Sequence, residues 1–535
     1  MQGEIRYDFM NNTTLTFTER QKSWLTLAAL WLLLMVLAGL RPLAVPDEGR
    51  YGEIGRWMLI SGDWLTPRLD GLPFFHKPPL LYWLEAISLA TFGVNELALR
   101  LVPALHAGLM LIALYLGVRT VSTEVMARRA AIMLGTSLSF LVGGQYVNHD
   151  MLVATWISIA IGCFAFSLMM PIPHAGLARL GFLACAFGFL SKGLIGIALP
   201  GMVILVWLIW NGQFKKILLL PWLSGLALFS AVALPWFVMA QRTYPDFFNY
   251  MFVGQQFSRY TAASYNNPQP WWFYLMVLLL LLFPWVFFAF AQIRNRSAMT
   301  LNTAWWRLCW VWILVILVFF SIPHSKLVGY ILPVMPPLAF LAALGWQHSM
   351  AHRSWASRWF SGICLVNIMM ALVIVLKVGG VTQSSRTEDI AAVLACAAAP
   401  TDTIYVTGAY PYDLPFYAQF SKPMVILDNW PWLRQQAGDG WQRELFEGAN
   451  FDAVAAQVLQ PLDILAQVAQ TPGHWLVARN GATPTGWTLH HQGAGWSVYR
   501  AGSHVVTGLP AKSPEPAQHK GLRGCTRQGN SQGHE

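Results

Sequence analysis

The chain has 535 residues, of which 56% are hydrophobic and only 11% are charged. Soluble domains carry about 25% charged residues, so this composition excludes an ordinary soluble protein. The net charge of +10 could suggest a nucleic-acid partner, but the basic residues are scattered between apolar stretches, and this pattern excludes that class. The six cysteines form no CxxC pair and predict no disulfide framework.

Apolar stretches run through most of the chain, and about 20 such residues cross a bilayer as a helix. The candidate spans are 24–40, 97–118, 130–147, 151–170, 177–191, 194–211, 217–240, 271–293, 304–322, 328–346 and 358–379. The first is followed by no cleavage site and is expected to be an uncleaved span. The sequence thus predicts a polytopic α-helical membrane protein with about 11–13 transmembrane helices.

The shorter apolar run 80–93 contains Glu85 and is ambiguous. Cytoplasmic loops are enriched in Lys and Arg, and this rule decides whether the run 80–93 crosses the membrane. With a cytoplasmic N-terminus and 80–93 lying at the outer surface, every inner loop is basic. The loops carry Arg119, Arg128, Arg129, Arg179, Lys215, Lys216, Arg294, Arg296, Arg307, Arg353 and Arg358. Counting 80–93 as a span would move all of them outside, so we expect a surface or re-entrant helix.

The character of the chain changes after about residue 380. Short β-strands are predicted at 403–406, 423–427, 475–478 and 496–499, and a helix at 386–398. We therefore expect three parts: a transmembrane domain at 1–380, whose outer-face loop is 41–96, a small outer α/β domain at 381–507, and a tail at 508–535. The tail is rich in Gly, Pro, Ser, Gln and Lys and is expected to be disordered.

Asp47 and Glu48 open the most informative motif, Val45-Pro46-Asp47-Glu48-Gly49-Arg50-Tyr51. A helix beginning here places Asp47, Arg50 and Tyr51 on one face. A helix N-cap with a surface ion pair is the ordinary interpretation. The functional alternative is that an ionisable group beside the membrane edge belongs to a site.

Further polar residues emerge on the same predicted outer face. Lys77 precedes two prolines at the foot of the 80–93 helix, and Lys192 lies between two short spans; either could be a membrane anchor. Asp150 begins a helix, where an N-cap is the ordinary role. Lys326 and Tyr330 are spaced i, i+4 at the mouth of another helix. Because all five residues are predicted on the same side of the membrane, we favour the hypothesis that they form one functional site.

These motifs resemble the lipid A aminoarabinose transferases (ArnT) and the wider protein O-mannosyltransferase-like superfamily with the GT-C fold. The resemblance rests on four segments and covers roughly residues 24–380. They are Asp47-Glu48-x-Arg50-Tyr51, His76-Lys77-Pro78-Pro79, Leu190-Ser191-Lys192-Gly193 and Ser325-Lys326-Leu327-x-x-Tyr330-Ile331-Leu332-Pro333. One position departs from the family pattern, because His76 stands where these enzymes have an acid before the lysine. The acceptor therefore stays open.

The resemblance implies a role for each matching residue. Asp47 would be the essential carboxylate, with Glu48 supporting it and Asp150 as a second acid. Arg50 and Lys77 would hold a carrier phosphate. The remaining donor-binding residues would be Tyr51, Lys192, Lys326 and Tyr330. It also implies an inner-membrane enzyme with a cytoplasmic N-terminus and a periplasmic C-terminal domain.

Sugar transfer needs a base for the incoming hydroxyl and stabilisation of the departing phosphate. The sequence has no G-x-G-x-x-G or Walker motif, which favours a polyprenyl-phosphate donor over a nucleotide sugar. One base beside the cations suggests inverting displacement. A glycolipid such as lipid A, a protein Ser/Thr or another envelope glycan remain alternative acceptors. A lipid transporter is the rival from another class, although no inverted repeat is seen.

Three histidines stand beside the motifs, His76, His149 and His324. Histidine is a common metal ligand, so a divalent ion near Asp47 is one interpretation. Polar lining of a wet cavity is the other. Their spacing does not decide between the two, and no cofactor is assigned.

Overall fold

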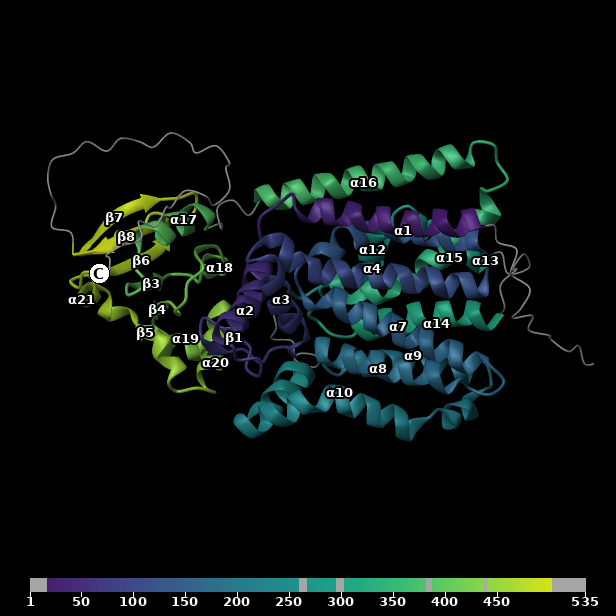
Figure 1. Cartoon of the computed structure of the whole chain (residues 1–535), viewed down its shortest axis with the longest axis horizontal. Helices are drawn as coiled ribbons and strands as arrows, with labels where there is room; N and C mark the ends of the chain where they lie inside the picture. Colours follow the sequence, from purple (N-terminus) through teal and green to yellow (C-terminus); the bar gives the residue numbers. More distant parts are fainter. Residues whose placement is uncertain are drawn as a thin grey trace, which may run out of the picture.

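The computed structural model describes residues 17–258, 267–294, 303–381, 387–436, 438 and 440–502. Within these ranges, helices fill the first two thirds of the chain and a mixed sheet follows (Figure 1). The predicted tail 508–535 lies outside the described residues, and the division into domains at 380 stays a prediction.

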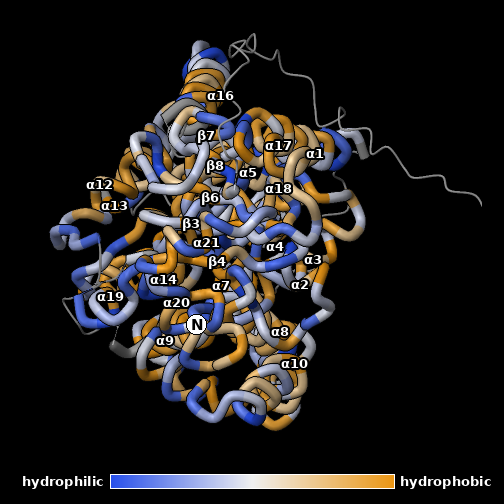
Figure 2. Tube along the Cα trace, turned by 90° about the vertical axis from the view of Figure 1, so that its left-hand side faces the viewer, coloured by the Kyte–Doolittle hydropathy of each residue, from blue (hydrophilic) through white to orange (hydrophobic). Residues whose placement is uncertain are grey.

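Eight helices of the described residues are long and apolar enough to cross a membrane. They are α1 (Phe17–Ala38), α4 (Glu96–Val121), α7 (His149–Met169), α8 (Ala175–Lys192), α10 (Trp222–Thr243), α14 (Thr303–Ser321), α15 (Met335–Ser349) with the preceding turn η5 (Val328–Val334), and α16 (Ala356–Val381). The chain is therefore a multi-pass membrane protein, as its composition predicts. Helix α7 is apolar on all sides and largely buried, whereas α10 and α16 lie at opposite edges of the bundle (Figure 2).

Three predicted spans differ from single long helices. The stretch 130–147 is broken into α5 (Glu124–Gly135), α6 (Leu138–Leu141) and the turn η1 (Gly143–Gln145), with a bend of 59°. The stretch 271–293 is broken into α12 (Phe273–Leu281) and α13 (Trp285–Arg294), bent by 116°. The third, α9 (Ile195–Trp210), is a shorter apolar helix. Counting each bent pair as one span raises the eight to ten.

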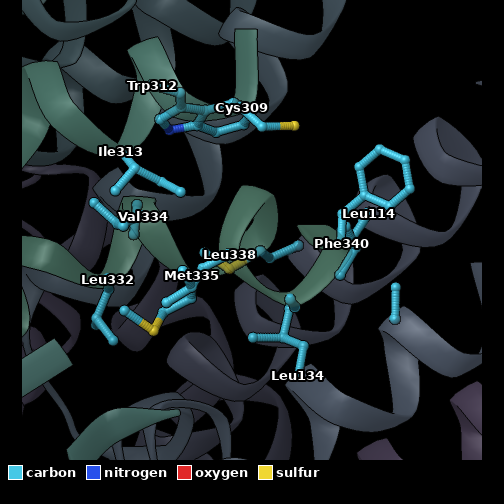
Figure 3. Close-up of a cluster of buried hydrophobic side chains, with 14 of the residues drawn as sticks. Leu114, Leu134, Cys309, Trp312, Ile313, Leu332, Val334, Met335, Leu338 and Phe340 are labelled. Atoms are coloured by element: carbon cyan, nitrogen blue, oxygen red, sulfur yellow. The ribbon is translucent and has the colours of Figure 1, made fainter. Parts of the chain in front are cut away.

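Close packing holds the bundle together. A Cβ built on Gly196 of α9 would lie 2.2 Å from the carbonyl carbon of Gly188 on α8, so only glycine permits this helix contact. Elsewhere apolar side chains from α4, α5, α14, η5 and α15 meet in one buried cluster (Figure 3). Leu114, Leu134, Ile313, Met335 and Leu338 are among its members.

One end of the bundle carries two further helices and a hairpin. Helix α2 (Asp47–Ser61) and helix α3 (Leu80–Phe92) lie between the bundle and the sheet (Figure 1). The strands β1 (Arg68–Leu69) and β2 (Leu72–Pro73) connect them. Glu85 of α3 is fully buried, and a Cβ on Gly55 of α2 would lie 2.7 Å from its Cβ. The 80–93 segment is thus a short helix packed closely on α2 at the end of the bundle.

The C-terminal sheet has six strands in the order β5-β4-β3-β6-β8-β7. The strands are β3 (Thr403–Thr407), β4 (Val425–Asp428), β5 (Leu459–Pro461), β6 (His474–Arg479), β7 (Trp487–Gln492) and β8 (Trp496–Ala501). Strands β3 to β6 pair in parallel, whereas β8 pairs antiparallel with both β6 and β7. The four predicted strands are present, and β5 and β7 were not predicted.

Short helices and turns complete the described elements. They are α17 (Glu388–Ala397), α18 (Leu414–Ala418), α19 (Trp430–Gln436), α20 (Trp441–Ala449), α21 (Leu465–Val468), η2 (Phe214–Leu219), η3 (Asn249–Ser258), η7 (Ala455–Val458) and η8 (Leu462–Ile464). Cys396 on α17 is disulfide-bonded, a single bridge that the cysteine spacing did not predict. The four cysteines within the bundle are free thiols.

Candidate active site

Asp47 stands at the first position of α2, one turn before Arg50. The Arg50 guanidinium pairs with Asp47 through Nη2 and with Glu444 of α20 through Nη1. The Tyr146 hydroxyl donates to the second carboxylate oxygen of Asp47 at 3.3 Å. The Asp47 side chain is nevertheless 37% exposed, whereas that of Glu444 is 14% exposed. Asp47 is therefore a positioned carboxylate that incoming groups can still reach.

Glu48, the next residue, is fully buried. Each of its two oxygens accepts three hydrogen bonds, from Arg41, Arg100 and the backbone N–H groups of Ala44 and Val147. Burial alone would raise the pKa of Glu48, but Arg100 and Arg41 outweigh it and lower the pKa to about 2. Glu48 thus stays ionised and anchors the start of α2, and its oxygens are taken up by these donors.

Asp150 lies in the first turn of α7, and Asn148 caps that helix. The Asn148 side chain accepts from the Asp150 N–H at 2.8 Å and donates to the carboxylate at 3.1 Å. Lys192, the last residue of α8, pairs with the same carboxylate, and its ammonium lies 4.3 Å from the ring centre of Tyr330. A Cβ on Gly329 would lie 2.1 Å from an Asp150 oxygen. The structure therefore brings Asp150, Lys192 and Tyr330 together.

Lys326 is placed differently from the other predicted donor contacts. Its side chain is buried, and the ammonium donates to the carbonyl of Gln269 at 2.9 Å and to that of Pro323 at 2.5 Å. It ties two backbone segments together beside η5. These contacts favour a structural role over a phosphate contact, and this geometry could not be read from the i, i+4 spacing.

His149 lies within electrostatic reach of three basic side chains. Lys77, Lys192 and Arg50 all lie close enough to act on its ring electrostatically. The ring itself is buried: Nδ1 donates to the Ser191 carbonyl at 2.8 Å, and Nε2 lies 3.2 Å from the Tyr82 hydroxyl. The three residues come from α2, the turn before α3 and the end of α8. Of the three, Arg50 is the one that pairs with Asp47, and Lys192 pairs with Asp150.

Tyr51 packs between Arg50 and His149. Its ring centre lies 5.1 Å from that of His149, and the Arg50 guanidinium lies 4.8 Å from the ring centre of Tyr51. The predicted grouping of Asp47, Arg50 and Tyr51 on one helix face is therefore present. The Arg50 guanidinium contacts the carboxylate of Asp47 as well as the ring of Tyr51.

The three histidines do not meet. His149 is engaged as described, His324 is exposed, and His76 stacks on Phe74 at 4.4 Å with its Nε2 3.6 Å from a carboxylate oxygen of Glu447. Within the described ranges, no group of three or more His, Cys, Asp or Glu side chains could hold a metal ion.

Several residues of this region escaped the sequence reasoning. Glu444 and Glu447 belong to α20, and Glu444 meets Arg50 across 394 positions of sequence. Tyr250, on η3, donates to Glu447 at 2.7 Å. No short-range pattern marks these three residues. Tyr146 lies in a polar segment at a predicted membrane edge, and that position is a signal that could have found it.

Comparisons with known proteins show which proteins this chain resembles. The family described as dolichyl-phosphate-mannose-protein mannosyltransferase matches residues 23–251. An undecaprenyl phosphate-alpha-4-amino-4-deoxy-L-arabinose arabinosyl transferase of Pseudomonas fluorescens is 33% identical over 60% of this chain and 59% of its own length. One of Sodalis glossinidius is 34% identical over 66% of this chain and 65% of its own. The chain thus spans about three fifths of these relatives.

A solved structure extends the likeness to almost the whole fold. The crystal structure of ArnT from Cupriavidus metallidurans bound to undecaprenyl phosphate has a TM-score of 0.76 at 23% identity. It covers 92% of this chain and 99% of that protein. This chain therefore has the fold of that ArnT structure, and the fold expected from the motif resemblance is confirmed.

Proposed function

We propose that this chain, which has the fold of ArnT and resembles the aminoarabinosyl transferases in sequence, is a membrane glycosyltransferase. It takes a sugar from an undecaprenyl-phosphate-like donor and transfers it to a cell-envelope acceptor such as lipid A. The observation that carries the proposal is the reachable carboxylate of Asp47 paired with Arg50, whose charge acts on His149 together with those of Lys77 and Lys192. This pairing of one base with several fixed cations suits a phosphate leaving group.

In the proposed reaction, Asp47 accepts the proton of the acceptor hydroxyl. The hydroxyl oxygen forms a bond to the anomeric carbon as the bond from that carbon to the phosphate oxygen breaks. The electron pair leaves with the phosphate, whose charge Arg50, Lys77 and Lys192 stabilise. Tyr146, which donates to Asp47, orients the carboxylate. A single displacement of this kind inverts the anomeric centre.

The remaining predicted residues take supporting roles in this proposal. Asp150 fixes Lys192 through their ion pair, and Tyr330 packs on the ammonium. Glu48 anchors α2 through Arg41 and Arg100. The backbone contacts of Lys326 support a structural role at the mouth of η5.

We place the protein in the inner membrane with a cytoplasmic N-terminus and a periplasmic C-terminal domain at 381–507, following the basic inner loops. The disulfide at Cys396 supports this placement, because disulfides persist in oxidising compartments such as the periplasm. Residues 1–380 then form the catalytic membrane domain. Cysteine labelling from either side of the membrane at an introduced residue in 390–500 tests the orientation.

Replacing Asp47 tests the function most directly. Purified Asp47→Asn protein, given a polyprenyl-phosphate sugar and lipid A, should release polyprenyl phosphate about a hundredfold to ten-thousandfold more slowly, because it lacks the base. Asp63→Asn is the matched control, since Asp63 is a half-buried carboxylate beyond the other end of α2, and asparagine keeps the oxygen that accepts from Leu65 and Thr66. Wild-type transfer by Asp47→Asn would refute the assignment. Mass spectrometry of the product, with a Ser/Thr peptide offered in parallel, identifies the acceptor.

A further inference from the structure

Helix α20 of the C-terminal sheet region turns two carboxylates toward the site. Glu444 and Glu447 are three residues apart, which places them on one helix face. Glu444 pairs with Arg50, and Glu447 lies 3.6 Å from His76, the neighbour of Lys77. The helix is seated firmly, because a Cβ on Gly448 would lie 2.4 Å from the carbonyl oxygen of Pro73 in β2.

The guanidinium of Arg50 pairs with two carboxylates, those of Asp47 and Glu444. Its Nη2 is bound to Asp47 and its Nη1 to Glu444. The rings of Tyr51 and Tyr412 lie 4.8 Å and 5.8 Å from the guanidinium carbon, so the side chain is held between them and is only 13% exposed. An arginine binds a phosphate best through two parallel N–H groups. A phosphate that binds Arg50 through Nη1 must therefore take the place of Glu444.

We propose that Glu444 is a built-in competitor of the carrier phosphate at Arg50, and that its return to Arg50 helps to expel the spent carrier. The inference rests on the proposed function, which brings a lipid phosphate to Arg50. It adds a device that controls occupancy of the same site from α20.

The charge of the carrier explains why a competitor is useful. In the donor, the phosphate that links sugar and lipid is a diester with one negative charge. After transfer it is a monoester, which carries about 1.5 to 2 negative charges at pH 7. The product therefore binds the cations of the site more strongly than the donor does. A carboxylate that returns to Arg50 counteracts that excess and speeds release.

Binding of polyprenyl phosphate to the full-length protein in lipid nanodiscs tests the competition. Glu444→Gln keeps the shape of the side chain but removes its charge, so the Kd should fall about tenfold, as expected for the loss of one competing charge-assisted hydrogen bond. Glu444→Asp, which shortens the side chain, should give a smaller gain. Uncharged polyprenol should bind all variants alike, and Glu444→Gln should add nothing in an Arg50→Gln background.

Asp452→Asn is the matched control. Asp452 pairs with Arg68 of β1 at 3.0 Å, so this change also weakens an ion pair between the sheet region and the hairpin, but away from Arg50. Asparagine retains the oxygen that accepts from Val454 and Ala455. The Kd of Asp452→Asn should equal that of the wild type. An equal gain in Asp452→Asn would attribute the effect to looser docking and overturn the inference.

The inference and the proposed function fail in different ways. If the wild type transfers sugar but Glu444→Gln binds polyprenyl phosphate no better, or binds it more weakly, the competition is wrong and the transferase stands. If Glu444→Gln binds the phosphate more tightly but the wild type transfers nothing, the competition stands and the transferase is wrong. Failure of the wild type to bind polyprenyl phosphate overturns both.

Discussion

Asp47 and Glu48 are chain neighbours with opposite surroundings. Asp47 is partly exposed and touches groups that a substrate can approach, whereas Glu48 is enclosed by two arginines that are themselves buried. Arg100 also donates to the carbonyls of Ala38, Arg41 and Pro42, so the same network fixes the chain that leads from α1 to α2. The carboxylate of Asp47 is thus accessible to a substrate, whereas that of Glu48 is taken up in holding the backbone.

Replacing Glu48 should therefore damage the fold, unlike replacing Asp47. Glu48→Gln leaves Arg41 and Arg100 buried without their countercharge, which costs about 3–5 kcal/mol. The melting temperature in detergent should fall clearly, and activity should fall with the folded fraction. A Glu48→Gln protein as stable as Asp47→Asn would contradict this division of roles.

The same network predicts an acid limit to stability. The folded pKa of Glu48, about 2, lies below its ordinary value of 4.5. The contribution of Glu48 to stability is thus complete above pH 4.5 and is lost as the pH falls toward 2. Thermal melts between pH 6 and pH 3 should show this loss in the wild type. Glu48→Gln should have a flatter profile, and equal slopes for both proteins would exclude Glu48 as the cause.

Local spacing predicted part of this arrangement and missed the rest for a physical reason. Asp47, Arg50 and Tyr51 share a helix face, so their proximity follows from i, i+3 and i, i+4 spacing alone. The partner of Arg50 on α20 could not be predicted, because that contact depends on how the sheet docks on the bundle. The ordinary interpretation of Asp150 as an N-cap was wrong in detail, since Asn148 takes that place.

Elements meet most closely where η5 passes Asp150. Gly329 lies so near the carboxylate that any side chain would displace it, and Asp150 in turn holds Lys192. The position of Lys192, which is proposed to bind the donor phosphate, therefore depends on a glycine in a different element. Spacing within η5 gives no sign of this contact.

Gly329→Ala should reduce transfer while leaving the protein folded. The added methyl pushes the Asp150 carboxylate away from Lys192, so we expect the KM for the donor to rise about tenfold, a loss equivalent to one charge-assisted hydrogen bond. Gly162→Ala on α7 is the control, because its Cβ would meet nothing within 4 Å. Equal kinetics for the two variants would show that the contact at Gly329 is without consequence.

At the level of elements, hydrophobic length predicted which stretches are helical but not their shape. The stretch 271–293 is apolar throughout, yet it bends by 116° where Pro284 interrupts it. The stretch 130–147 breaks before Ser137, which caps the short helix α6. Pro284 and Ser137 are both plain in the sequence. The prediction nevertheless treated each stretch as one straight helix, because it relied on the length of the apolar run.

The bundle and the sheet region are joined by buried polar contacts around the β1–β2 turn. Arg56 donates to the Phe420 carbonyl at 2.7 Å, and Asp70 accepts from the Met424 N–H at 3.0 Å. Burial raises the pKa of Asp70 to about 8, with Glu53 adding to the effect and the Met424 hydrogen bond opposing it. The junction thus contains a carboxyl group that is protonated at neutral pH.

This group should make the stability of the protein fall as the pH rises from acidic to neutral values. The folded protein keeps the Asp70 proton up to about pH 8, whereas the unfolded chain loses it near 3.8. Stability therefore falls as the pH rises between these values and levels off above 8. Asp70→Asn keeps the acceptor and tolerates the positive φ, so it should lose less stability between pH 6 and pH 8 in thermal melts. A parallel decline in both proteins would rule Asp70 out.

The distance in sequence between Arg50 and Glu444 also means that the two residues are synthesised at different times. A ribosome adds about 5–20 residues per second, so Arg50 exists for roughly 20–80 s before Glu444 has been made. Once the bundle helices up to residue 381 have been made, Asp47, Arg50 and Lys77 are all present, but the carboxylate that shares the arginine is not. On the competition proposed above, Arg50 is most available to a lipid phosphate in this interval, before α20 has been made.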